Sequence, residues 1–233
     1  MIIGRVHEWK EHHAMESAVY VGFKAANRLD ELGTSEAILH AAAAYGSAYS
    51  AECTANDPPT ARGFILWSKT VRGVRDGHAD LGWVRNQKDR CYPITIHPDG
   101  KWAIAVAGGD EDTGKEDGRP STRSTKGRST KEAVHMNQQV FDLGDITRIK
   151  KEAGIQTWVL LVHEDKDTDE IRLELSLPVR VNAEGYVDSW SERIILAPLL
   201  PGAPGVKAEP NTPGSSPPEV NEEVDIEVRR RAG

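Results

Sequence analysis

The segment IRLELSLPVRV, residues Ile171 to Val181, decides the fold. Its apolar side chains occupy every second position, and Arg, Glu, Ser and Pro stand between them. Successive side chains of a β-strand point to opposite faces of a sheet, so strict alternation is typical of a strand with one face in the core. We therefore predict a long strand at 171–181.

The flanking segments predict a strand on either side of it. Residues 158–162 (WVLLV) are wholly apolar, and residues 186–196 form a third extended segment. Short polar turns at Asp165–Asp169 and Asn182–Gly185 join the three segments. Parallel neighbours would need crossovers of about a dozen residues or more, which these turns cannot supply. The three strands should therefore form an antiparallel meander.

The N-terminal third predicts helices instead. Residues 16–32 and 34–51 carry apolar or small side chains at helical spacing, and Gly33 between them suits a helix C-terminus. The small residues of 34–51 would allow close approach to a neighbouring helix, and the two helices are expected to form an antiparallel hairpin. A third helix is expected after Thr60, with an apolar stripe made of Phe64, Trp67, Val71 and Val74. Further on, the turn at Pro98-Asp99-Gly100 predicts a hairpin of 93–97 with 101–107, and a short helix is expected near 131–141.

These elements predict an α+β fold in which N-terminal helices pack on one face of an antiparallel sheet. We expect a single domain over 1–198, helical to about residue 80 and β-rich over about 83–198. Residues 109–131 contain no large apolar side chain and predict a long mobile loop. Residues 199–233 are rich in Pro and Gly and predict a disordered tail, in which 224–229 either adds an edge strand or stays free.

The composition of the chain indicates the cellular compartment in which we expect the protein. The chain has 233 residues, a net charge of −7 and no apolar run long enough to cross a membrane. Its two cysteines, Cys53 and Cys91, lack the spacing of a zinc or redox motif and are expected to be reduced. We therefore expect a location in the cytoplasm of the producing cell or of a host. Oligomeric state cannot be deduced from this composition.

Positive charge is concentrated in the middle of the chain. Residues 62–131 hold fourteen Lys and Arg against nine Asp and Glu, a balance of +5, while both flanks are acidic. Arginine and lysine near aromatic side chains suit phosphate contacts and base stacking. The residues that could bind nucleic acid or phosphate are Arg72, Arg75, Arg85, Arg119, Arg123, Lys126, Arg128 and Lys131. An ordinary solvated face would explain the same pattern.

Acidic clusters follow two of the expected strands. Oxygen ligands at strand ends could hold Mg²⁺ or Mn²⁺ if both clusters were adjacent in space. The candidate metal ligands are Asp110, Asp112, His163 and Asp165, and a phosphoryl-transfer or hydrolytic enzyme would also use Glu111 and Glu164. Solvated turns are the simpler interpretation. No hydrolase, zinc-protease or dinucleotide motif occurs, so we expect no catalytic residues and no cofactor.

The segment Gly109–Lys115 fits the phosphate-binding pattern G-x-x-x-x-G-K. However, Glu116 replaces the metal-binding hydroxyl, and three consecutive acidic residues would lie beside the bound phosphates. No helix follows directly to direct its N-terminus at an anion. We interpret the match as a coincidence, unless parallel strands joined through helices flank it.

Three stretches resemble proteins encoded in actinobacterial and phage genomes whose activity is uncharacterised. They are Gly82-Trp83-Val84-Arg85, residues 97–114 (HPDGKWAIAVAGGDEDTG) and residues 192–198 (ERIILAP), and the resemblance spans about 60–198. It implies at most an accessory role linked to a mobile element. The favoured hypothesis is a non-enzymatic accessory or binding protein that engages a protein partner or a polyanion. Nucleic-acid or nucleotide binding and a metal-dependent enzyme are the alternatives.

Overall fold

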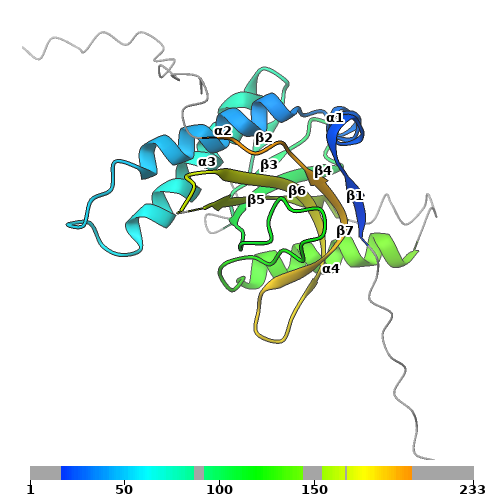
Figure 1. The fold of residues 1–233 in the computed structure, drawn as a ribbon. Helices are drawn as coiled ribbons and strands as arrows, with labels where there is room; N and C mark the ends of the chain where they lie inside the picture. The colour runs from blue at the N-terminus through cyan, green and yellow to red at the C-terminus, as the bar shows by residue number, and fades with distance from the viewer. Residues whose placement is uncertain (1–16, 87–91, 144–153, 166, 201–233) are drawn as a thin grey trace, which may run out of the picture.

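The computed structural model describes residues 17–86, 92–143, 154–165 and 167–200. Within these ranges the backbone forms one seven-stranded mixed sheet in the order β1-β7-β6-β5-β4-β3-β2 (Figure 1). The strands are β1 (Ala18–Tyr20), β2 (Val84–Arg85), β3 (Ile94–Ile96), β4 (Trp102–Gly108), β5 (Gln156–Glu164), β6 (Ile171–Val181) and β7 (Val187–Ile195). The fold is therefore α+β, as predicted.

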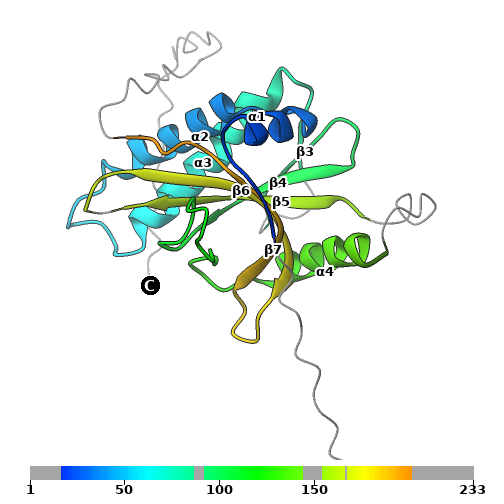
Figure 2. The same ribbon diagram turned by 45° about the vertical axis from the view of Figure 1, so that its right-hand side comes forward.

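Helices cover both faces of this sheet. Three of them, α1 (Gly22–Glu31), α2 (Glu36–Ser50) and α3 (Ala61–Ala79), lie on one side, and α4 (Arg128–Leu143) lies on the other (Figures 1 and 2). The prediction that helices cover a single face is wrong for α4. Val134 of α4 packs against Val159 and Leu161 of β5, whose side chains alternate with those that face the first layer. A strand that is apolar on both faces, as β5 is from Trp158 to Val162, needs a cover on both faces.

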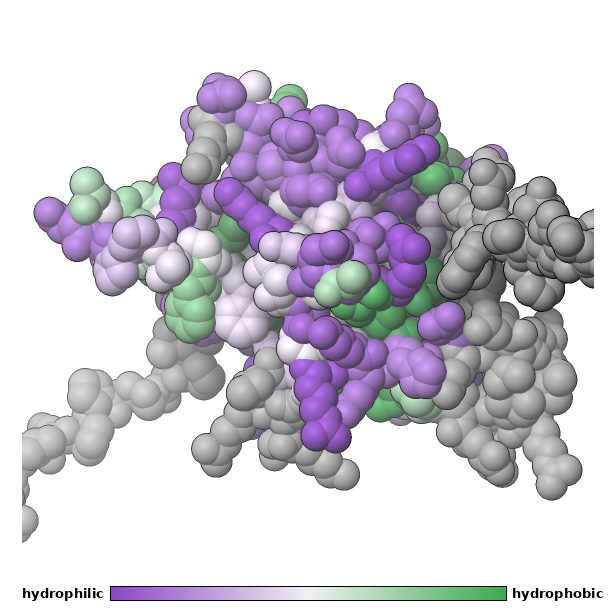
Figure 3. Space-filling model, turned by 90° about the horizontal axis from the view of Figure 1, so that it is seen from below, coloured by the Kyte–Doolittle hydropathy of each residue, from purple (hydrophilic) through white to green (hydrophobic). Residues whose placement is uncertain are grey.

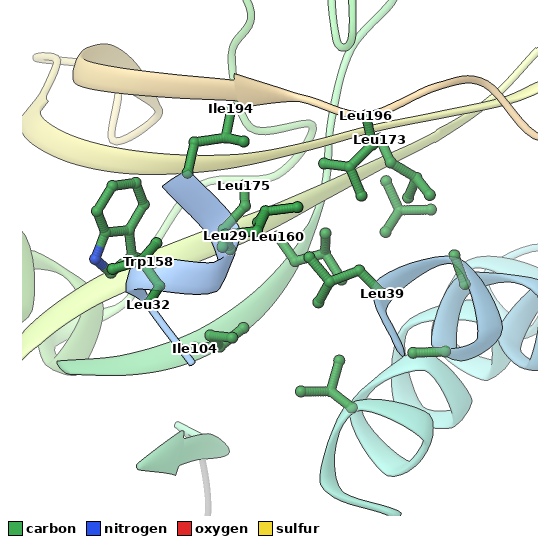
Figure 4. Close-up of a cluster of buried hydrophobic side chains, with 14 of the residues drawn as sticks. Leu29, Leu32, Leu39, Ile104, Trp158, Leu160, Leu173, Leu175, Ile194 and Leu196 are labelled. Carbon is green, nitrogen blue, oxygen red and sulfur yellow. The ribbon is translucent and has the colours of Figure 1, made fainter. Parts of the chain in front are cut away.

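The larger core lies between the sheet and helices α1 to α3 (Figure 4). Leu173 and Leu175 of β6 are fully buried in it, beside Trp158 and Leu160 of β5 and Ile194 of β7. The predicted alternation holds in the first part of β6, where Ile171, Leu173, Leu175 and Leu177 enter this core. The register with β7 shifts from Leu177 onward, and Val181 packs on the opposite face.

The predicted antiparallel centre is confirmed, but the sheet is not a simple meander. β6 pairs antiparallel with β5 and with β7, and β3 pairs antiparallel with β4. In contrast, β4 and β5 are parallel over seven residue pairs, Trp102↔Gln156 to Gly108↔Val162. The chain between them is long enough to include α4, which permits a parallel crossover. A short parallel pair, β1 with β7, closes the opposite edge.

The predicted helices occur, with changes at their ends. Residues 18–20 form β1, and only Gly22–Glu31 of the expected first helix is helical. The side chain of Ser35 accepts the N–H of Ile38 and caps α2. On α3, Val71 and Val74 are buried, whereas Phe64 is 63% exposed although the predicted stripe placed it in the core. Phe64 lies in the first turns of α3, where it stacks against Trp67 at the surface.

Helix α2 packs closely through small residues, as predicted, but its partner is α3, so the predicted hairpin of the first two helices is wrong. A methyl group on Gly46 would lie 2.2 Å from Thr70 Oγ1, and one on Gly73 would lie 2.7 Å from the Cα of Ala42. Glycine at these positions lets the two backbones approach to a distance that no side chain would permit.

The segment between β4 and α4 is ordered against the sheet, contrary to the predicted mobile loop. Its anchor is a buried ion pair: Arg193 Nη2 lies 2.6 Å from Glu174 Oε2, and the two side chains are 4% and 0% exposed. Arg193 also donates to the carbonyl oxygens of Gly118 at 2.7 Å and Lys115 at 2.9 Å. Glu174 accepts the N–H of Gly114 at 3.0 Å. The segment lacks apolar side chains because its backbone polar groups, rather than its side chains, bind the protein.

Other predictions lie outside the described residues. These are the tail beyond residue 200, its edge strand at 224–229, and Cys91. None of the helices in the described part is both long and apolar enough to cross a membrane. Seen from below, the described surface is mainly polar, with an apolar area near the middle (Figure 3).

Candidate functional site

A gap in the edge of the sheet forms the most developed hollow of the described structure. Strand β4 extends three residues beyond its pairing with β3, which ends at Ile94↔Ala105. Pro93 would stand opposite Val106 but has no N–H to offer. The indole N–H of Trp67 takes its place and donates to the Val106 carbonyl at 3.0 Å. Beyond Val106, the N–H of Arg123 donates to the carbonyl of Gly108 at 2.8 Å, and this hydrogen bond bounds the other end of the gap.

The cleft in this gap has a volume of about 500 Å³. Its walls come from α3, from the residues before β3, from the segment that precedes α4, and from β4 and β5. Because it lies beyond the edge of β4, it receives side chains from both faces of the sheet. The lining is mainly apolar and includes Leu66, Trp67, Tyr92, Pro93, Val106, Ala107, Val159 and Val162. A cleft of this size and character is typical of a small-molecule site.

The cleft is adjacent to the carboxyl ends of the only parallel pair, β4 with β5, in the central part of the sheet that is described. Ligands of sheets that contain parallel strands are commonly bound beyond these ends. Glu164, the last residue of β5, contributes to the lining, and its carboxylate accepts from Ser50 Oγ at 3.4 Å and from Arg62 Nη2 at 3.4 Å. The topology therefore places the cleft where the fold class favours a binding site.

Lys126 brings a positive charge into this apolar setting. Its side chain lines the cleft, and its ammonium donates to Ser124 Oγ at 3.2 Å. No carboxylate of the described residues lies within 4 Å of it. Burial lowers the pKa of Lys126, because the charged form loses hydration and gains no counter-charge. Arg123 lies beside it in the lining and is exposed.

The other predicted basic residues are dispersed. Arg72 on α3 pairs with Asp76 at 3.2 Å, and Arg128 pairs with Glu132 at 2.7 Å. Arg119 is exposed on the loop, and Lys131 lines a second hollow beside α4. The eight residues therefore do not gather at one site, and only Arg123 and Lys126 share the cleft.

Arg75 and Arg85 form a separate positive group. Arg75 on α3 is close enough to Arg85 on β2 for the second charge to lower the pKa of the first, after the larger effect of burial. The Nε of Arg75 is buried with no hydrogen-bond partner, and neither guanidinium has a carboxylate of the described residues within 4 Å.

The predicted metal ligands do not converge. Within the described ranges, no group of three or more His, Cys, Asp or Glu is placed to hold a metal ion. Asp112 lies 3.8 Å from Lys115, and Asp165 lies 4.0 Å from Arg172, so each carboxylate faces a cation of the protein. Asp110 and His163 are closer to each other: burial raises the pKa of Asp110, and the neighbouring histidine partly offsets this rise.

The segment Gly109–Lys115 follows a parallel strand, which is the context that would revive the nucleotide-binding interpretation. However, the Gly114 N–H points at the Glu174 carboxylate, an anion of the protein itself. Helix α4 begins only at Arg128. The backbone donor that a phosphate would need is thus already bound, and the match remains a coincidence.

Sequence reasoning missed Trp67 as a cleft residue, and it missed that Lys126 is partly buried with no carboxylate of the described residues within 4 Å. The stripe on α3 placed Trp67 in the core. The one usable signal was Pro93 next to the start of β3, since proline interrupts a ladder and leaves its neighbour without a donor.

Comparison with known proteins gives no family assignment. No protein-family model matches the chain, and no curated protein or solved structure is significantly similar to it.

Proposed function

We propose that this chain is a binding protein that takes a small, largely apolar molecule into the cleft at the edge of β4. The observation that carries the proposal is an apolar hollow of about 500 Å³ beside the ends of the parallel strands. Aromatic side chains at Trp67 and Tyr92 offer flat surfaces to a ring-containing ligand. This proposal specifies the non-enzymatic binding role that the sequence favours.

The ionisable side chains of the lining also favour binding over catalysis. They are Arg123, Lys126 and Glu164. Glu164 is held by Ser50 and Arg62, and its described hydrogen bonds do not include the lysine. A general base needs to lie within hydrogen-bond reach of the group that it serves. The lining thus offers an apolar surface and one positively charged wall, formed by Arg123 and Lys126, and this combination suits the binding of a ligand.

A fragment screen by two-dimensional NMR tests the proposal. We expect monocyclic and bicyclic aromatic fragments to shift the amide signals of Val106, Thr125 and Gly127. The substitution Gly63→Phe should block these shifts, because a Cβ at Gly63 meets no atom within 4 Å and the side chain can fill the cleft. Ala79→Phe, at the exposed end of α3 and outside the lining, is the control. If no fragment shifts the cleft amides, the proposal is wrong.

Polyanion binding is a second candidate, favoured by the group formed by Arg75 and Arg85. Two guanidinium groups with no carboxylate partner in the described part of the chain suit backbone phosphates, which are sequence-independent contacts. We expect any affinity for single-stranded DNA to fall with salt and to weaken in Arg75→Gln/Arg85→Gln. Arg128→Gln, whose guanidinium is already paired, should bind as the parent does. A gel shift that is insensitive to the double substitution would exclude this candidate.

A further inference from the structure

The lining of the cleft contains a positive charge, that of Lys126, with no carboxylate of the described residues within 4 Å. The Lys126 ammonium lies in a mainly apolar lining, and it donates to the neutral hydroxyl of Ser124 at 3.2 Å. A lysine without a counter-charge ordinarily extends its flexible stem into water. Lys126 is instead half-buried, and its backbone explains why: the Lys126 N–H donates to the carbonyl of Gly185 at 2.8 Å and fixes this part of the chain against the turn between β6 and β7.

Among the residues that the structure describes, no carboxylate neutralises this charge from within the cleft. Glu164 is the carboxylate of the lining, and its oxygens accept from Ser50 and Arg62. The neighbouring guanidinium of Arg123 has the same sign as Lys126 and also lacks a described carboxylate within 4 Å. The wall formed by residues 123–126 is therefore positive and has no internal counter-ion among the described residues.

The start of α4 adds to the same wall. Gly127, directly before this sixteen-residue helix, and Thr130, in its first turn, both line the cleft. The first N–H groups of a helix lack acceptors within the helix, and its dipole favours negative charge at this end. The Lys126 ammonium, the hydroxyl groups beside it and the N-terminus of α4 thus all favour an anionic group.

We propose that the ligand of the cleft carries a carboxylate or a similar anionic group, which Lys126 binds while the apolar part lies against Trp67 and Val106. This inference rests on the proposed function and names the ligand class: an amphipathic organic anion. The anion supplies the counter-charge that the described lining lacks, and charge-assisted hydrogen bonds of this kind are among the strongest in proteins. Arg123, at the exposed rim, attracts the anion but is not required to hold it.

Two probe molecules of nearly the same shape but different charge distinguish the effect of ligand charge on affinity from the effect of ligand shape. 2-Naphthoate and 2-naphthamide have the same ring system and nearly the same size, but only the first is charged at neutral pH. Their affinities are measured by isothermal titration calorimetry for the full chain and for Lys126→Met. Lys131→Met is the control, since Lys131 is an exposed lysine five residues away that lies outside the cleft.

We expect the parent protein to bind 2-naphthoate about tenfold or more tightly than 2-naphthamide. Lys126→Met should lose this preference and keep its affinity for the amide, while Lys131→Met should behave as the parent does. Equal affinity of the parent for both probes, or an unchanged preference in Lys126→Met, would overturn the inference and leave the apolar cleft standing. If neither probe binds, both this inference and the proposed function fail.

Discussion

The buried pair of Arg193 and Glu174 offers the sharpest test of how the fold is held together. Replacing Arg193 with methionine leaves the carboxylate of Glu174, which is fully buried, without its counter-charge. It also removes the donors for the carbonyl groups of Gly118 and Lys115. Breaking a buried ion pair by removing one partner typically costs about 3–5 kcal/mol. Since small domains have free energies of unfolding of about 5–15 kcal/mol, this loss is a large fraction of the total.

Urea unfolding, followed by circular dichroism, measures this loss for Arg193→Met. The control is Arg180→Met, which breaks the pair with Asp188 at 3.2 Å, where the side chains are 63% and 27% exposed. A surface pair of this kind contributes at most about 1 kcal/mol. We also expect Arg193→Met/Glu174→Met to be more stable than Arg193→Met alone, because no charge is then left buried.

Hydrogen exchange gives a second, local readout. The Gly114 N–H donates to Glu174, so its amide should exchange faster in Arg193→Met if the segment 109–122 is released. The reasoning is refuted if Arg193→Met loses no more stability than Arg180→Met and the Gly114 amide remains equally protected.

Three further results are expected. Gly46→Ala should lower the free energy of unfolding by about 1–3 kcal/mol, because the new methyl group would meet Thr70 Oγ1, whereas Gly63→Ala on α3 should be neutral or stabilising; urea midpoints compare them. Burial lowers the pKa of His78 below its ordinary 6.5, so the unfolded chain binds the proton more readily. Stability should therefore fall as pH drops below about 6.5, and His78→Gln should flatten this slope; equal slopes would contradict it. Affinity for 2-naphthoate should weaken with rising pH earlier than an ordinary lysine pKa of 10.5 implies, since only protonated Lys126 holds the anion, and calorimetry of Lys126→Met should show no such dependence.

The central strands and the start of α2 could be predicted from the sequence because their signals are local. The alternation of 171–181 fixes which side chains of β6 face each layer, and short turns force its neighbours to run antiparallel. Likewise, Ser35 and the small residues after it predict the start of α2 and its close packing. Each prediction depends on residues within about a dozen positions of one another.

The cleft could not be predicted in the same way, because its walls come from segments as far apart as Leu66 and Val162. Lys126 belongs to a segment that appears purely polar and mobile in the sequence. Its burial depends on the turn at Gly185, sixty residues further along the chain, whose carbonyl binds its backbone.

The sequence by itself determined the α+β class and the antiparallel run of β5, β6 and β7, since periodicity and turn length act along the chain. Tertiary structure alone decided that β4 lies parallel to β5, that α4 covers the second face, and that Glu174 and Arg193 are buried. Alternation places Glu174 opposite to the apolar side chains of β6, but it does not show what covers that face. The cover is a polar segment held through its own backbone, and such contacts leave no periodic trace in the side chains.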